Sequence, residues 1–130
     1  MSNIYGNGVA LAEKLLDSLW LRQTVTTNNI VNVDTPDYKA QYVTFEDELA
    51  MRIKSAVSGG GGQQTKIARA IRQSVPQLRT TTTESSRLDG NNVDMVQEQV
   101  ELVRSAYQYQ AMVSSISNDI NRLKTAAKAF

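Results

Sequence analysis

The last third of the chain carries a long helical pattern without a break. Residues 93–130 contain neither proline nor glycine, and apart from a slip near residues 106–110 apolar side chains recur there every three or four residues, as expected for one buried face of a helix. A helix of about 30 residues is about 45 Å long, which is too long for a compact globule made from a chain of this length. This helix therefore requires a partner helix. Its apolar face consists of Val96, Val100, Val103, Tyr107, Val113, Ile116, Ile120, Leu123, Ala127 and Phe130.

The partner helix is predicted near the start of the chain, over residues 8–34. Val9, Ala12, Leu16 and Leu19 have the same three-to-four spacing, and beyond Trp20 the same face becomes polar. The sequence thus predicts a mainly α fold in which the two long helices pair as an antiparallel coiled coil. The core expected for this pair is Val9, Leu16, Leu19, Val100, Val103, Val113, Ile116, Ile120 and Leu123.

A second, shorter helix is predicted near residues 45–57. Thr44 is its expected N-cap, and three carboxylates follow in the first turn, where the helix dipole favours them. The glycines at 59–62 end this helix, because a glycine run loses too much backbone entropy to stay helical.

Residues 59–91 are rich in Gly and Thr and are predicted to form a flexible or short-β central arm. A brief helix at 67–72 and short strands around Val75, Leu78 and Thr80–Thr83 are two alternatives that the sequence leaves open. The predicted organisation is an N-terminal helix at 1–34, a proline turn, irregular segment and short helix at 35–58, the arm at 59–91, and a C-terminal helix at 92–130.

The composition argues against several classes of function. The chain has no cysteine and no histidine, so disulfides, thiolate metal sites and the commonest general base are excluded. The carboxylates Glu46, Asp47 and Glu48 are explained by a helix N-terminus, and Glu98 and Glu101 by a solvated helix face. We therefore predict no catalysis, no cofactor and no metal site.

The charge is balanced overall but not along the chain. The formal net charge is +1, whereas residues 52–87 carry seven basic residues and one acidic residue. A basic arm can be a solvated segment, a contact to acidic faces of neighbouring copies, or a nucleic-acid site. No aromatic residue lies between Phe45 and Tyr107 to stack on bases, so nucleic acid is not an expected partner.

Two further features concern membranes and export. No apolar stretch approaches the roughly 20 residues of a membrane span, so none is expected. The first eight residues lack a basic region followed by an apolar run, so no cleaved secretory signal is expected either.

One short segment, residues 28–39, marks the end of the first helix. Three asparagines stand within five residues, and their amides compete for backbone hydrogen bonds inside a helix. Thr35 precedes a proline and is pushed toward an extended conformation, so the helix should end near Asp34. Pro36 then suits the second position of a turn that continues with Asp37.

A second segment, residues 88–95, precedes the C-terminal helix. It reads Leu-Asp-Gly-Asn-Asn-Val-Asp-Met, and its Asp94 can cap a helix whose third residue is Gln97, as in a capping box.

These two segments resemble the signatures of the flagellar basal-body rod and hook proteins. The first is similar to Asn-Asn-Ile-Ala-Asn-x-x-Thr-Pro-Gly-Tyr-Lys, with departures at Val31, where Ala is usual, and at Asp37, where Gly is usual. The second is similar to the segment that opens the C-terminal helix in proximal-rod proteins. The matching residues are Asn28, Asn29, Ile30, Asn32, Thr35, Pro36, Tyr38 and Lys39, together with Asp89, Gly90, Asn91, Asn92, Val93 and Asp94.

The resemblance implies a structural subunit of the bacterial flagellar basal-body rod, of the proximal type because no large domain separates the two helices. Such subunits stack helically into a hollow rod that crosses the periplasm and transmits torque. The implied partners are copies of itself, other rod proteins, the adapter protein of the membrane ring complex, and the flagellar type III export apparatus, which exports these subunits without a cleaved signal peptide.

Alternatives are the neighbouring proximal-rod protein, another short axial component, or a generic coiled-coil adapter. Within the rod interpretation, the apolar seam holds the helix pair together. The matching residues of the two segments are expected to make assembly contacts.

Overall fold

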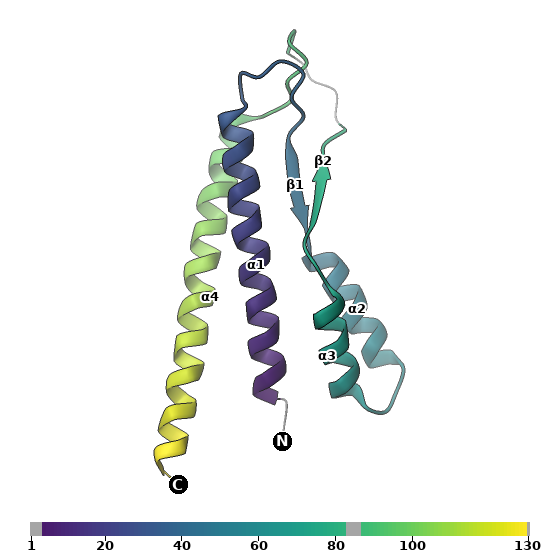
Figure 1. Ribbon diagram of the computed structural model, residues 1–130, viewed down its shortest axis with the longest axis vertical. Coiled ribbons are helices and arrows are strands. Elements are labelled where there is room, and N and C mark those ends of the chain that lie inside the picture. Colours follow the sequence, from purple (N-terminus) through teal and green to yellow (C-terminus); the bar gives the residue numbers. More distant parts are fainter. Residues whose placement is uncertain (1–3, 83–86, 130) are drawn as a thin grey trace.

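The computed structural model describes residues 4–82 and 87–129 of the chain (Figure 1). These residues form a mainly helical, elongated structure whose two longest helices run antiparallel, side by side. The elements in chain order are α1 (Ile4–Val31), β1 (Gln41–Thr44), α2 (Glu46–Ser58), α3 (Gln63–Gln73), β2 (Gln77–Thr80) and α4 (Met95–Ala129).

The predicted helix pair is confirmed, with somewhat different ends. α1 begins earlier than residue 8 and ends at Val31, after which the Asn32 amide donates to the Asn28 carbonyl at 3.1 Å and the Thr35 amide to the Asn32 carbonyl at 3.0 Å. α4 has 35 residues and is therefore about 52 Å long. Residues 1–3 and Phe130, which the sequence assigned to the two helices, lie outside the described residues.

The face of α4 that packs on α1 is not the predicted one. Small and polar residues are buried along the pair, among them Ser18 and Thr26 of α1 and Ser105 of α4, while Leu19 is 5% exposed. On α4 the less exposed positions are Glu98, Glu101, Leu102, Ser105, Tyr109, Met112 and Ile116, which is a second stripe with three-to-four spacing.

Most of the predicted core residues are exposed in the subunit. Leu19 is buried and Leu16 and Ile116 are half-buried. In the first half of α4 there are two stripes with helical periodicity, and the more polar one, with the small and fully buried Ser105, faces α1, so Val100 and Val103 lie on the other side. The predicted core residues that are exposed are Val9, Val100, Val103, Val113, Ile120 and Leu123.

The central arm contains both of the alternatives that the sequence left open. α3 extends well beyond residues 67–72, and β2 pairs antiparallel with β1, with Gln41 opposite Thr80 and Thr44 opposite Gln77. The strand therefore pairs with residues before α2 rather than within the arm, and Thr83 lies outside the described residues. Because β1 precedes α2 and β2 follows α3, their pairing brings the end of α3 back to the start of α2. The two helices therefore form a helical hairpin.

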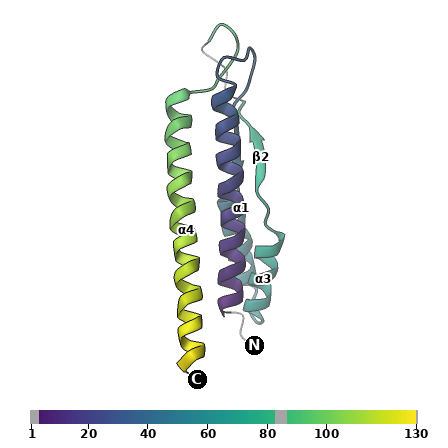
Figure 2. The same cartoon turned by 60° about the vertical axis from the view of Figure 1, so that its left-hand side comes forward.

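The hairpin of α2 and α3 packs on α1. Phe45, Leu49 and Ile71 are buried and contact Leu11 and Leu15 of α1. α1 thus lies between α4 on one side and the hairpin and β1 on the other (Figures 1 and 2). This second core explains why α3 forms directly after the glycines at 59–62.

The predicted helix starts are confirmed for α4 and corrected for α2. The Asp94 carboxylate accepts hydrogen bonds from the amides of Val96 and Gln97 at 3.1 and 3.2 Å, as an N-cap does. Thr44 belongs to β1, and Phe45 is the N-cap residue of α2, without a side-chain capping bond. Thr44 pairs with Gln77 in the β ladder and α2 begins only at Glu46, so Thr44 lies one residue before the N-cap position.

Candidate functional site: an asparagine junction

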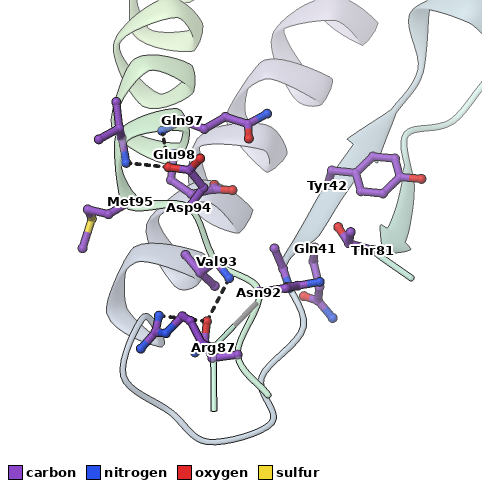
Figure 3. A pocket seen from close by; sticks show the side chains of 13 residues that line it. Gln41, Tyr42, Thr81, Arg87, Asn92, Val93, Asp94, Met95, Gln97 and Glu98 are labelled. Carbon is purple, nitrogen blue, oxygen red and sulfur yellow. Dashed lines mark hydrogen bonds between the residues drawn. The ribbon is translucent and has the colours of Figure 1, made fainter. Parts of the chain in front are cut away.

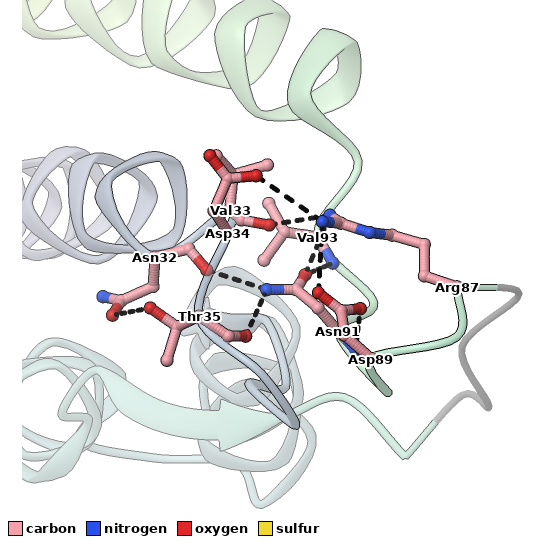
Figure 4. Close-up of polar contacts among 8 residues, drawn as sticks. All are labelled: Asn32, Val33, Asp34, Thr35, Arg87, Asp89, Asn91 and Val93. Carbon is pink, nitrogen blue, oxygen red and sulfur yellow. Dashed lines mark hydrogen bonds and ion pairs between the residues drawn. The ribbon is translucent and has the colours of Figure 1, made fainter.

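The two signature segments meet at one end of the helix pair (Figure 4). The Asn91 side chain is fully buried, and its Nδ2 donates to the carbonyl oxygens of Asn32 and Thr35, both at 2.8 Å. Its Oδ1 accepts a hydrogen bond from the amide of Val93 at 2.8 Å. One amide side chain therefore holds the end of α1, the proline turn and the entry to α4 together. We call this cluster the asparagine junction.

Asn29 makes a second set of contacts, one turn of α1 earlier. It is 1% exposed; its Nδ2 donates to the Gln41 carbonyl at 2.7 Å and to Oε2 of Glu98 at 3.0 Å. Its Oδ1 accepts from the Gln41 amide and from the Tyr38 hydroxyl, both at 3.0 Å. These four bonds use the full capacity of the amide and connect α1, β1 and α4.

The proline turn carries a left-handed residue where the family signature has glycine. Asp37 has φ of +60°, and its amide donates to the Asp89 carbonyl at 2.7 Å. Gly90, at φ +78°, lies so close that an added Cβ would be 3.4 Å from the Asp37 Cα and closer still to its carboxylate. Glycine is therefore required at 90, while Asp37 adopts a conformation that aspartate tolerates better than most residues.

The backbones of the two segments are also joined directly. The Asn92 amide donates to the Tyr38 carbonyl at 3.2 Å, and Oδ1 of Asn92 accepts from the Ala40 amide at 2.6 Å. Nζ of Lys39 donates to the Gly90 carbonyl. Residues 38–40 and 90–92 thus form a continuous contact between positions about 50 residues apart in the chain.

Sequence reasoning missed Arg87, which belongs to the junction. Its Nη1 donates to the Val33 carbonyl at 2.7 Å, and its Nη2 lies 3.4 Å from Asp89 Oδ2 and 3.7 Å from Asp34 Oδ1 (Figure 4). A cation at a helix C-terminus satisfies free carbonyls and the helix dipole. Its only signal in the sequence is its place immediately before the second segment.

Two titratable groups beside the junction are perturbed. Burial raises the pKa of Glu98, the hydrogen bond from Asn29 partly opposes this, and the nearby Glu101 and Asp94 carboxylates raise the pKa further. Burial also raises the pKa of Tyr38. Glu98 was assigned to a solvated face, but it lies half-buried against α1 because the packed stripe of α4 contains it.

An open cavity of about 780 Å³ adjoins the junction. Figure 3 shows Asp94, Gln97 and Glu98 from the start of α4 on one side and Gln41 and Tyr42 of β1 on the other. Across residues 4–82 and 87–129, no group of three or more acidic side chains is arranged to hold a metal ion. Within the same residues no helix is both long and apolar enough to cross a membrane.

The predicted signature residues separate into three groups by burial. Asn29, Asn91 and Val93 are buried, so they hold the subunit together and cannot touch a neighbour directly. The half-buried members are Ile30 and the residues that take part in the junction, namely Asn32, Tyr38, Lys39, Asp89, Gly90 and Asn92. The exposed members, which remain available to neighbours, are Asn28, Thr35, Pro36 and Asp94.

The fold and the junction together define a structural protein: an antiparallel helix pair in which buried amides join the end of α1 to the start of α4. Comparison with known proteins agrees. Flagellar basal body rod protein FlgB of Cereibacter sphaeroides is 35% identical over 111 residues, covering 82% of this chain and 83% of the relative. The chain belongs to the flagellar basal body rod protein FlgB family.

Other relatives of the same name extend the similarity. FlgB of Escherichia coli is 33% identical over 106 residues, with 76% of this chain and 77% of the relative covered. FlgB of Bacillus subtilis is 29% identical over 134 aligned positions, with 95% of each chain covered. No protein-family model matches the chain.

Proposed function

We propose that this chain is a structural subunit of the proximal part of the bacterial flagellar rod, which polymerises helically and transmits torque from the motor to the hook. Membership of the rod-protein family supports the assignment. The observation that carries the mechanism is the asparagine junction, in which buried Asn29 and Asn91 tie the end of α1 to the start of α4.

The junction suits a part that bears load. Torque on a helical assembly tends to slide and bend neighbouring helices, and a two-helix unit resists sliding only if its helices are fastened. Side-chain amides buried with all their partners make specific contacts whose loss is costly. The junction lies where the end of α1 meets the start of α4, so it opposes relative movement of these two helices.

The outward face of α4 requires cover from neighbouring subunits. Val96, Val100, Val103 and Tyr107 are all exposed in the subunit, and such a contiguous apolar stripe marks an interaction surface. Complete burial of one such side chain contributes about 1.5 kcal/mol or more. The stripe that periodicity assigned to the core of the pair thus serves contacts between subunits.

The finer assignments follow from the family resemblance. The partners are further copies, the other rod proteins and the adapter protein of the membrane ring complex, and the subunits are delivered by the flagellar type III export apparatus without a cleaved signal. The location is the periplasmic part of the basal body.

Deletion of the gene in its host tests the function. We expect loss of rods, hooks and filaments with the membrane ring retained, seen by electron microscopy of the cell envelope, and loss of swimming. The unaltered gene supplied in trans restores both and is the control. Normal flagella on the deleted strain would refute the assignment.

A further inference from the structure

The hairpin of α2 and α3 carries a groove on a side that does not face α1. The groove has a volume of about 540 Å³ and runs between the two helices. Its apolar part is Met51, Ala56 and Ala70, and its basic part is Arg52, Lys66 and Arg69. The carboxylate of Glu48 also lines it and is paired with Arg52. Met51 is largely exposed. Such a groove fits an acidic partner that also presents an apolar side chain.

Two cations beside this groove have no ion-pair partner among residues 4–82 and 87–129. Arg69 and Arg72 stand one turn apart on α3 and are both exposed, and neither forms an ion pair with a residue in the described ranges. By contrast, Nη2 of Arg52 lies 3.0 Å from Glu48, and Nζ of Lys66 donates to the Gly60 carbonyl at 2.7 Å. Arg69 and Arg72 are therefore the charges available to a partner.

A complementary surface lies on α1. Val9, Glu13, Asp17, Trp20 and Val31 follow one another at multiples of three or four residues, and all are exposed. They share one face of the helix, which points away from both α4 and the hairpin, and the face contains no cation. Trp20 is 64% exposed although it is the largest side chain of the protein. We call this face the acidic tryptophan stripe.

We propose that the hairpin groove of one subunit receives the acidic tryptophan stripe of a second copy of this chain. Glu13 and Asp17 are one turn apart, as Arg69 and Arg72 are, so the two pairs of charges match in spacing. Trp20 then enters the groove beside Met51, where a neighbouring guanidinium stacks on the indole.

This contact is heterologous, because each subunit offers a groove to one neighbour and a stripe to another. Heterologous contacts that do not close into a ring generate helical assemblies. The contact deepens the proposed function by naming the surfaces through which copies join. It rests on that function only in requiring that copies of the chain assemble.

The single tryptophan provides a direct test on the full-length chain. On association, Trp20 leaves water, so its fluorescence moves to shorter wavelength as protein concentration rises and returns when salt is added. Sedimentation velocity measures the association in parallel. The first variant, Arg69→Glu with Arg72→Glu, makes the groove acidic, and the second, Glu13→Lys with Asp17→Lys, makes the stripe basic.

Each variant alone is expected to weaken association by about tenfold or more, because two attractive charge pairs become repulsive. An equimolar mixture of the two variants restores association, as does a single chain with all four substitutions. The matched control is Lys124→Glu with Lys128→Glu, which changes the net charge by the same amount on exposed positions of α4 and leaves association unchanged. No variant removes a hydrogen bond or ion pair described within the subunit, and circular dichroism verifies folding.

Three outcomes overturn the proposal. One is a wild-type chain whose Trp20 emission is independent of concentration. Another is weakening of association in the control to the same degree. The third is that neither the mixture nor the chain with all four substitutions recovers association, which means that the basic groove binds some other acidic partner. The proposed function is tested separately by the deletion strain. If that strain lacks rods but the variant with Arg69→Glu and Arg72→Glu associates as well as the wild-type chain, the contact is refuted and the function stands.

Discussion

Replacing Asn91 with alanine tests whether the asparagine junction stabilises the helix pair. The substitution removes two donated hydrogen bonds of 2.8 Å from a fully buried side chain. It also removes two accepted bonds, one from the Val93 amide at 2.8 Å and a long one from Nη1 of Arg87 at 3.4 Å. Each buried hydrogen bond contributes about 1 kcal/mol net. The Asn32 and Thr35 carbonyls keep other donors, the amides of Thr35 and Tyr38, so the loss is limited to about 2–3 kcal/mol of unfolding free energy.

Urea denaturation followed by circular dichroism measures this change, and a thermal melt should shift downward by roughly 10 °C. Asn28→Ala is the matched control, because Asn28 is exposed and its Nδ2 makes a single bond of 3.1 Å to the Tyr38 hydroxyl. The control should lose less than about 1 kcal/mol. Equal losses in the two variants, or a loss below about 1 kcal/mol for Asn91→Ala, would mean that water replaces the amide and that the junction does not hold the pair.

Three further predictions concern the helix pair. Leu19→Asp places a charge in the α1 core and should unfold the pair, whereas Asn32→Asp should keep the helicity of the subunit and impair assembly. Circular dichroism and a swimming assay measure the two effects, and an equal loss of helicity in both variants would contradict the separate roles of Leu19 in folding and Asn32 in assembly. Ser105→Ala should leave stability unchanged or raise it, because the buried Ser105 hydroxyl makes no hydrogen bond; a thermal melt that falls by several degrees would show that an unseen partner exists. Burial raises the pKa of Glu98, so the stability linked to this group is present at low pH and is lost as pH rises through the raised pKa. Glu98→Gln keeps an acceptor for Asn29, and in urea titrations the stability of this variant relative to the wild-type chain should increase between about pH 4 and pH 7. No such increase is expected if the carboxylate is fully solvated.

Local patterns were enough to predict that α1, α2 and α4 exist and to place the start of α4, while the exact ends of α1 and the extent of α3 differ from the prediction. The absence of proline and glycine, the spacing of apolar residues and the capping residue Asp94 all act within one or two turns of backbone, so they can be read in sequence. The proline turn was found for the same reason, whereas the left-handed conformation of Asp37, at a position where the family has glycine, was shown only by the structure.

Contacts between distant segments could not be predicted in this way. The hydrogen bonds of Asn91 to Asn32 and Thr35 join residues more than 50 positions apart, and only the family resemblance pointed to both segments together. Arg87 escaped notice because an isolated arginine before a loop has no pattern of its own. The pairing of β2 with β1 was missed because both strands are short and carry mixed side chains.

The sequence by itself determined that two long helices form, that Asp94 caps the second of them, and that the chain must pair them. Which side of α4 faces α1 was decided only by the tertiary structure. α4 carries two stripes with the same helical periodicity, and the more apolar one, with Val100 and Val103, lies exposed, while the stripe with Ser105 packs on α1. The spacing of apolar residues shows which side chains share a helix face, but not which neighbouring element covers that face. The small Ser105 side chain permits the close approach of the helices, and the fastening by Asn29 and Asn91 fixes their rotation.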